Sequence, residues 1–237
     1  MVWQITRDKF FSREQRNQLV KATEEKAIVD LQKGRSTWVR RWMLVDLALF
    51  SGLRVSEMAN LRIGDLQLNR SEKLLYVRNG KGGKSGHVTI DSALAKHLRE
   101  YIAWKKITGE SIAAEAPLLT GSKEGRPYTT MGLQKQFKEA IRNAGLPSHY
   151  SIHSCRHTFA TYLLANTKNL RLVQKQLRQS SPSVTAVYAD VTPEDMSEAR
   201  GYGEDQRLKG LSLLAAQDRQ VDIDQWRRLI GRIGVVE

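Results

Sequence analysis

The chain has a single cysteine, Cys155, among its 237 residues. One cysteine excludes an intrachain disulfide framework and a cysteine-rich zinc site. The sequence also lacks any apolar run near the roughly 18 residues that a membrane span requires, and it lacks a signal-peptide pattern at its N-terminus. We therefore expect no membrane partner and a cytoplasmic location. Internal repeats and low-complexity tracts are absent as well.

Acidic residues are scarce relative to basic ones. The sequence holds 25 Asp and Glu against 38 Lys and Arg, a formal net charge of +13. Residues 191–237 carry 7 basic and 9 acidic side chains, so an excess of +15 lies in residues 1–190. Such a field favours capture of a polyanion. Nucleic acid is the first expectation for a partner, and a ribosomal or membrane surface is a weaker alternative.

Apolar residues make up 41% of the chain and charged residues 27%, which indicates a globular protein. Ser12 and Gln15 have the spacing of a capping box, which predicts a first helix that continues to Gly34. Gly52 is the expected end of a second helix. Arg54 is expected at the start of a short third helix.

Two strands are predicted, over 74–77 and 87–90, because these segments are apolar and rich in residues that favour strands. The glycine-rich segment 79–86 between them is typical of a hairpin turn. The sequence therefore predicts a mixed α+β fold that is mainly helical and has a small antiparallel β-sheet. Further helices are predicted over 92–107, 130–143, 151–165, 169–178 and 183–188.

The last part of the chain differs from the rest. We expect residues 1–190 to form one domain and residues 191–237 to form a helical tail. Within that tail, Ile223, Trp226, Leu229, Ile230 and Ile233 form an apolar stripe at helical spacing. The stripe must pack either on its own domain or on a neighbouring protomer.

Several residues could carry chemistry on their own. His153 and His157 are spaced like zinc ligands on one helix face, but no acid lies between them and Arg156 would repel a cation, so we expect no metal. Cys155 is expected in the core. The glycine-rich turn around Lys81 lacks the spacing of a phosphate-binding P-loop, and it would instead present a lysine on a turn.

Four short motifs occur in a set order. They are Leu53-Arg54-Val55-Ser56-Glu57-Met58, Gly80-Lys81-Gly82, His153-Ser154-Cys155-Arg156-His157 and Val187-Tyr188. Together they resemble the catalytic domain of the tyrosine recombinases, the phage-integrase family, over about residues 10–190. The resemblance implies double-stranded DNA as substrate, no cofactor, and a homo-tetramer on DNA that is weakly associated or monomeric without it. It also implies association with the nucleoid.

The chemistry of phosphodiester cleavage explains why such residues would be grouped. Attack by a tyrosine builds extra negative charge on the non-bridging oxygens, and two guanidiniums match that charge without a metal. A histidine can handle the phenolic proton, and a lysine can protonate the leaving 5′-oxygen. The resemblance assigns these roles to Tyr188 as nucleophile, Arg54 and Arg156 as phosphate clamp, Lys81 as general acid and His153 as acid/base helper.

Other residues are alternatives to these assignments. Tyr150, Tyr162 and Tyr202 are rival nucleophiles, although only Tyr188 has the family spacing after Arg156. We expect His157 to pack against its helix rather than to act in catalysis.

The sequence departs from the family pattern at the sixth site position, where the family has His or sometimes Trp and this chain has Gln179. An amide can donate a hydrogen bond but cannot shuttle a proton. Arg178 stands where the family often has Gly, which could change the turn before Gln179. In addition, only 53 residues precede Arg54, so we expect either a fragment or a short member that lacks a second DNA-clamping module.

Three other functions remain open. An inactive relative that binds DNA and regulates or assists a recombinase would explain Gln179. A type IB topoisomerase-like enzyme would share the tyrosine chemistry but would relax DNA as a monomer. A basic ribosome- or RNA-associated protein would explain the charge but not the ordered motifs.

Overall fold

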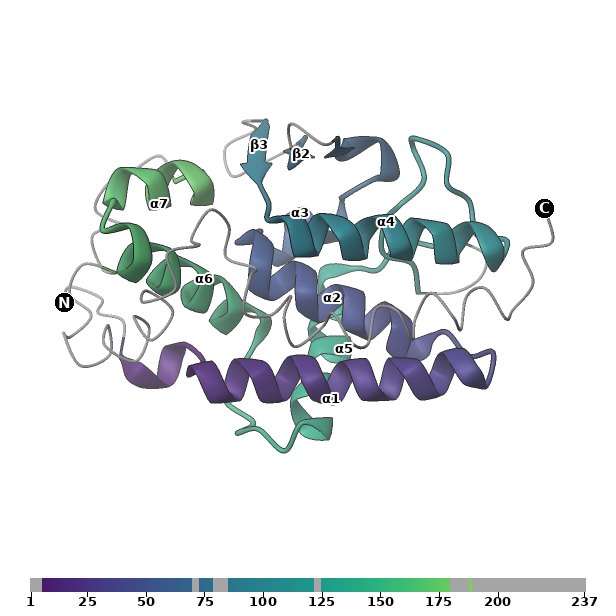
Figure 1. Cartoon of the computed structure of the whole chain (residues 1–237), viewed down its shortest axis with the longest axis horizontal. Coiled ribbons are helices and arrows are strands. Elements are labelled where there is room, and N and C mark those ends of the chain that lie inside the picture. Colours follow the sequence, from purple (N-terminus) through teal and green to yellow (C-terminus); the bar gives the residue numbers. More distant parts are fainter. Residues whose placement is uncertain (1–5, 70–72, 79–84, 122–124, 180–187, 189–237) are drawn as a thin grey trace.

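A computed structural model describes residues 6–69, 73–78, 85–121, 125–179 and Tyr188. The described helices are η1 (Arg7–Lys9), α1 (Arg13–Gln32), α2 (Thr37–Ser51), α3 (Val55–Ala59), η2 (Ile63–Asp65), α4 (Ser92–Ile107), α5 (Thr130–Asn143), α6 (Ile152–Thr167) and α7 (Leu170–Leu177). The described strands are β1 (Leu66–Leu68), β2 (Lys73–Val77) and β3 (Gly86–Thr89). This arrangement confirms a mainly helical fold with a small antiparallel sheet (Figure 1).

The structure confirms the predicted helix ends at Ser12, Gly52 and Arg54. The Ser12 hydroxyl accepts a hydrogen bond from the Gln15 amide at 3.2 Å, and the Gln15 side chain accepts one from the Ser12 amide at 2.9 Å. This capping box satisfies amide groups that would otherwise lack partners at the start of α1. Gly52 ends α2 in the left-handed conformation, with φ 68°, and Arg54 is the N-cap of α3.

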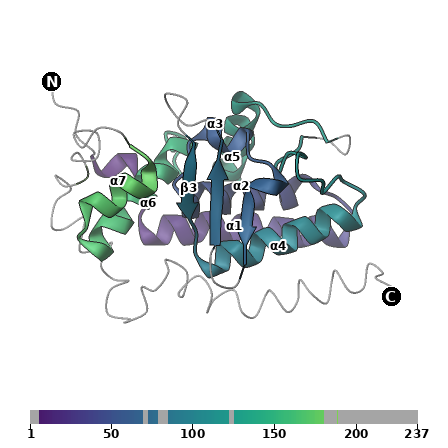
Figure 2. The ribbon, with the colours of Figure 1, turned by 90° about the horizontal axis from the view of Figure 1, so that it is seen from above.

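The sheet has the order β1-β2-β3, and both pairs are antiparallel. Val77 pairs with Gly86, so the predicted hairpin is confirmed on both sides of its turn. Strand β1 was not predicted, because its three residues are too few to show an alternating pattern. Figure 2 shows the three strands side by side, with α7 next to β3.

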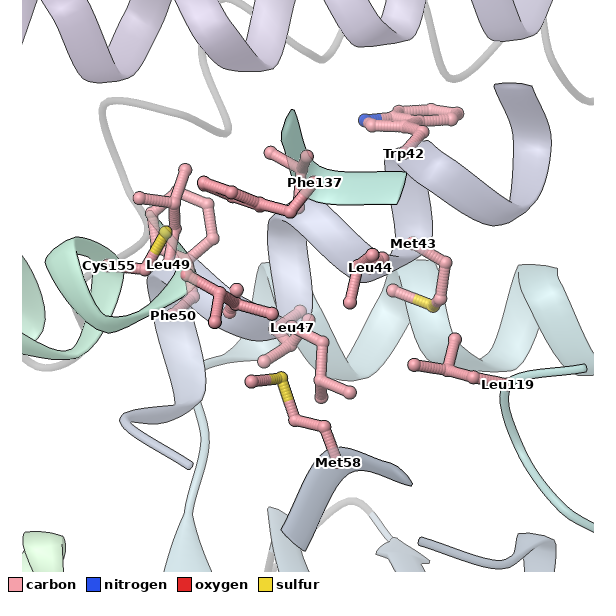
Figure 3. Close-up of a cluster of buried hydrophobic side chains, with 14 of the residues drawn as sticks. Trp42, Met43, Leu44, Leu47, Leu49, Phe50, Met58, Leu119, Phe137 and Cys155 are labelled. Atoms are coloured by element: carbon pink, nitrogen blue, oxygen red, sulfur yellow. The ribbon is translucent and has the colours of Figure 1, made fainter. Parts of the chain in front are cut away.

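Helix α2 is the centre of the core. Its residues from Trp42 to Ser51 are all buried, and it contacts α1, α4, α5 and α6. Figure 3 shows its Leu47 among side chains from neighbouring elements, including Met58 of α3. Cys155 of α6 is fully buried beside this cluster, which confirms its predicted place in the core. The C-terminal half of α2 and the start of α3 are therefore held in the hydrophobic core.

A second, smaller core lies between α6 and α7. It comprises Phe10, Phe159, Ala160, Leu163, Leu164, Val173, Leu177 and Tyr188. Val173 and Leu177 are one turn apart on α7 and point the apolar face of that helix at α6. Tyr188 thus joins the body of the domain through its ring.

The remaining predictions of secondary structure differ little from the structure. Helices α4 and α5 have the predicted bounds, while α6 and α7 end within two residues of theirs. The helix predicted over 183–188 lies outside the described residues except for Tyr188, which is in a turn. The tail 191–237 also lies outside them, so the division at residue 190 stays a prediction. None of the described helices has the length and apolar character needed to cross a bilayer.

Candidate active site

Arg54 is held at the start of α3 by an acidic side chain from the same helix. Its backbone amide donates to Glu57 Oε2 at 2.7 Å, and its Nη1 donates to Glu57 Oε1 at 2.9 Å. The Glu57 side chain is almost fully buried, whereas the Arg54 side chain keeps 24% of its surface exposed. Glu57 therefore fixes the guanidinium of Arg54 while leaving one side of it open to a ligand.

Arg156 lies on the first turns of α6 and reaches the ends of two other helices. Its Nη1 donates to the carbonyl of Gly52 beyond α2, and its Nη2 donates to the carbonyl of Leu177, the last residue of α7, at 2.8 Å. These carbonyls lie at the negative ends of helix dipoles, which stabilises a buried cation. Burial, with the nearby charge of Arg54, lowers the pKa of Arg156 to about 10, so it stays charged at neutral pH.

Gly52 is needed at its position for two separate reasons. Its backbone is left-handed, and a Cβ there would lie 2.7 Å from Cδ1 and 2.8 Å from Cε1 of Phe159. Gly34 has a similar φ of 63°, but nothing lies within 4 Å of a Cβ built on it. A comparison of substitutions at Gly52 and Gly34 therefore separates the cost of backbone strain from the cost of close packing.

We expect Gly52→Ala to destabilise the protein by about 3 kcal/mol and Gly34→Ala by about 1 kcal/mol. Left-handed backbone costs alanine about 1 kcal/mol at both positions, and overpacking against Phe159 adds about 2 kcal/mol at the first. Urea unfolding of both variants measures the two costs. If the two variants lose the same free energy of unfolding, Phe159 moves aside freely. The close packing of Gly52 against Phe159 would then not hold Arg156 in place.

The hydroxyl of Tyr188 meets a histidine of α6. His157 Nδ1 lies 3.0 Å from Tyr188 Oη, and the two rings are tilted by 46°. Tyr188 is only 2% exposed. Burial raises its pKa to about 12, against the opposing charges of Arg156 and Arg54. The phenol is therefore neutral at pH 7, and it donates its proton to Nδ1 when that nitrogen carries none.

His157 is held in its neutral form. Burial, then the neighbouring His153 and Arg156, lower its pKa to about 4. A neutral imidazole at hydrogen-bond distance from the nucleophile can accept its proton. Sequence alone predicts packing for His157 and a helper role for His153, since a histidine after Arg156 fits packing well. The contact of His157 with the Tyr188 hydroxyl differs from that prediction, because it depends on where Tyr188 returns to α6.

We expect His157 to make stability fall as the pH is lowered from about 6.5 to 4. Above that range the imidazole is neutral in both states; within it, the unfolded chain binds a proton that the native state excludes, which favours unfolding. The loss is on the order of 1–2 kcal/mol, allowing for solvent screening. Urea unfolding at pH 7.5 and 4.5 of the wild type and His157→Asn measures it by difference. Identical pH dependence in both proteins would contradict the buried, neutral state.

The other predicted site residues are His153, Gln179 and Lys81. His153 is exposed one turn before His157, and among the described residues the hydrogen-bond partner of the Tyr188 hydroxyl is His157. Gln179 follows α7 and is half-buried, with its carbonyl accepting from Gln174 Nε2 at 3.3 Å. Lys81 lies outside the described residues. The roles assigned to these residues remain predictions.

Arg178 is the residue that follows α7. It adopts the left-handed conformation, with φ 50° and ψ 50°, that a glycine would take there. Its Nη2 forms an ion pair with Glu57 Oε1, so one carboxylate contacts two guanidiniums. Sequence reasoning noted Glu57 and Arg178 without giving either a role. A signal for Glu57 was present, since an acid three residues after an N-cap favours a bond to the cap amide.

The structure thus brings together Arg54, Arg156 and Tyr188 from three separate segments, with Glu57 and His157 in support. Burial raises the pKa of the Tyr188 phenol while the charges of Arg156 and Arg54 act to lower it, and forked guanidiniums are the donors that match a phosphate. Among the residues that the structure describes, no three His, Cys, Asp or Glu side chains are grouped in a way that could hold a metal ion.

Comparison with known proteins points to one family. The model of the phage integrase family matches residues 9–195. The tyrosine recombinase XerC of Lactobacillus leichmannii is 33% identical over 172 residues, which are 72% of this chain and 57% of that protein. The chain therefore spans somewhat more than half the length of this curated relative.

Solved structures show the same fold. The crystal structure of XerA recombinase has a TM-score of 0.65 at 24% identity, covering 84% of this chain and 65% of that one. The structure of XerH site-specific recombinase bound to difH substrate has a TM-score of 0.63 at 23% identity, covering 84% and 55%. With a family model that matches most of its length and a fold shared with these recombinases, this chain belongs to the phage integrase family.

Proposed function

We propose that this chain is the catalytic part of a site-specific DNA recombinase, of integrase or invertase type. It cleaves and rejoins double-stranded DNA through a 3′-phosphotyrosyl intermediate. One observation carries the proposal: a buried tyrosine hydroxyl is hydrogen-bonded to a neutral histidine, and it lies near enough to Arg54 and Arg156 for their charges to oppose the rise that burial causes in its pKa. The relatives named as tyrosine recombinases support the same chemistry.

In the proposed reaction, Arg54 and Arg156 bind the non-bridging oxygens of the scissile phosphate and stabilise the charge of the transition state. Tyr188 Oη attacks phosphorus as its proton passes to His157 Nδ1. The bond from phosphorus to the 5′-oxygen breaks, and Lys81 gives that oxygen a proton. The products are a 3′-phosphotyrosyl bond and a free 5′-hydroxyl.

Religation is the reverse sequence. A 5′-hydroxyl attacks the phosphotyrosine, and the tyrosine leaves as a neutral phenol after it recovers its proton. Because the phosphodiester energy is kept in the covalent intermediate, the reaction needs no nucleotide and no metal cofactor. His153, exposed one turn from His157, is proposed as an acid/base helper that exchanges the proton with solvent.

The net charge of +13 supports a polyanionic partner. We propose that the chain acts as a homo-tetramer on DNA and is monomeric or weakly associated without it. The tail 191–237 would exchange between protomers, and the protein would be cytoplasmic and associated with the nucleoid when bound to DNA.

Gln179 favours one competing function, an inactive DNA-binding relative with a regulatory or accessory role. An amide at this position cannot replace the acid/base chemistry of the family histidine. The proposal holds that a hydrogen-bond donor is sufficient there, since the family also accepts Trp.

The test is covalent trapping on nicked suicide substrates made from the DNA that flanks the protein's own gene. We expect a protein–DNA band on a denaturing gel, and a nucleotide-modified peptide that contains Tyr188 after proteolysis and mass spectrometry. Salt-sensitive DNA binding without any adduct would instead establish the inactive relative. Relaxation of supercoiled plasmid with no dependence on site would establish a topoisomerase-like enzyme.

A further inference from the structure

Arg178 adopts a conformation that its residue type disfavours. It is left-handed, with φ 50°, at the position after α7 where glycine is the favoured residue. A left-handed arginine costs about 1 kcal/mol relative to glycine. Strained residues that persist in a native structure are concentrated at functional sites. A functional contact of the Arg178 side chain would explain why this strain persists.

The side chain of Arg178 lies across the candidate site. Its Nη2 forms an ion pair with the buried Glu57, the carboxylate that also holds Arg54. Its Cδ would lie 3.3 Å from a Cβ at Gly86, so the stem passes closely over strand β3. Strand β3 begins five residues after Lys81 in the sequence. Arg178 therefore connects α7, α3 and β3 at one point.

One donor nitrogen of Arg178 has no partner among the residues that the structure describes. Its Nη1 is buried, and no hydrogen-bond acceptor for it exists among the described residues. The whole side chain is only 14% exposed. A buried unpaired guanidinium nitrogen costs about 1–3 kcal/mol unless a ligand satisfies it. An acceptor that reached Nη1 when the substrate binds would remove this cost.

The local charges indicate the nature of that acceptor. Arg54, Arg156 and Arg178 influence one another electrostatically, and Glu57 is the carboxylate among them. Three guanidiniums against one carboxylate leave two positive charges. A phosphate oxyanion is the ligand that matches both this charge and forked N–H donors.

We infer that Arg178 is a third phosphate-binding arginine of this site, in addition to Arg54 and Arg156. It donates Nη1 to a non-bridging oxygen beside the position that Gln179 occupies in place of the family histidine. This inference rests on the proposed function for the identity of the phosphate as part of DNA. The binding of a phosphate group by Arg178 can be tested without DNA.

The test uses inorganic phosphate as the probe. The thermal unfolding midpoint of the full chain is followed as phosphate replaces chloride at constant ionic strength, which yields an apparent dissociation constant. We expect a phosphate-specific rise for the wild type and an affinity at least about tenfold lower for Arg178→Gly. Glycine takes the left-handed conformation without strain, so this variant should fold. Arg178→Lys, which keeps the charge but loses the fork, should lie in between.

Arg142→Gln is the matched control. Arg142 is an arginine of α5 with a 75% exposed side chain, ion-paired with Glu139. The Arg142→Gln variant also loses one positive charge, in this case at the surface. Its affinity for phosphate should stay within twofold of that of the wild type. An Arg178→Gly variant that also stays within twofold, or a wild type with no phosphate-specific rise, would overturn the inference.

Trapping on DNA separates this inference from the proposed function. Dependence of phosphate affinity on Arg178, with no Tyr188 adduct on any DNA, would retain the phosphate site and reject the recombinase activity. If the wild type forms the adduct but its phosphate affinity does not depend on Arg178, the proposed activity is supported and the phosphate site at Arg178 is rejected. Where both hold, we expect adduct formation by Arg178→Gly to be slowed by at least tenfold.

Discussion

Tyr188→Phe is expected to abolish the covalent protein–DNA adduct completely while leaving DNA affinity within about twofold. The variant removes one oxygen, the atom that would bond to phosphorus. The ring stays in its apolar cluster with Phe159 and Leu177. Denaturing gels of trapped suicide substrate, beside native gel shifts at matched salt, measure the two quantities.

The structure offers a matched control for this experiment. Tyr162 is another buried tyrosine, on α6 itself, and its hydroxyl donates to the Phe11 carbonyl at 3.5 Å. Tyr162→Phe removes the same atom from a buried tyrosine whose ring lies under Arg16, an arginine that is not part of the candidate site. It should form adduct at the wild-type rate. An adduct that survives in Tyr188→Phe and disappears in Tyr162→Phe would assign the nucleophile to the rival residue.

The elements that support the site were predictable because their signals are local. The capping box at Ser12, the left-handed Gly52 and the N-cap position of Arg54 each depend on residues only a few positions away. Strand β1 was missed for the same reason, since three residues carry too little pattern. Local sequence signals therefore predict where helices begin and end better than they predict the existence of very short strands.

The contacts within the site could not be predicted in this way. His157 meets Tyr188 only because the chain returns to α6 after α7, and Glu57 meets Arg178 only because α7 ends beside α3. The spacing of these residues along the sequence does not determine the distances between their side chains. The family resemblance selected Arg54, Arg156 and Tyr188, but it gave Glu57 no role and treated Arg178 only as a departure. The structure adds the side chains that orient the arginines.

Arg156→Lys is expected to lower the rate of adduct formation by about a thousandfold. Lysine keeps a positive charge but cannot donate to the carbonyls of Gly52 and Leu177 and to a phosphate oxygen from one planar group. Losing a preorganised donor to a developing oxyanion costs about 10²–10³ in rate. The carbonyls left without partners would also lower the free energy of unfolding by about 1–3 kcal/mol.

A second buried arginine separates the catalytic loss from the structural one. Arg40 of α2 has a side chain only 7% exposed, and its Nη2 donates to the buried Glu110 at 2.6 Å. Arg40→Lys should lose comparable stability, yet it should form adduct at the wild-type rate at a temperature where both variants remain folded. If both variants instead lose the same fraction of activity, Arg156 acts only by joining α2, α6 and α7. A thousandfold gap between them would mean that its guanidinium acts on the phosphate, because stability is matched and only the position relative to Tyr188 differs.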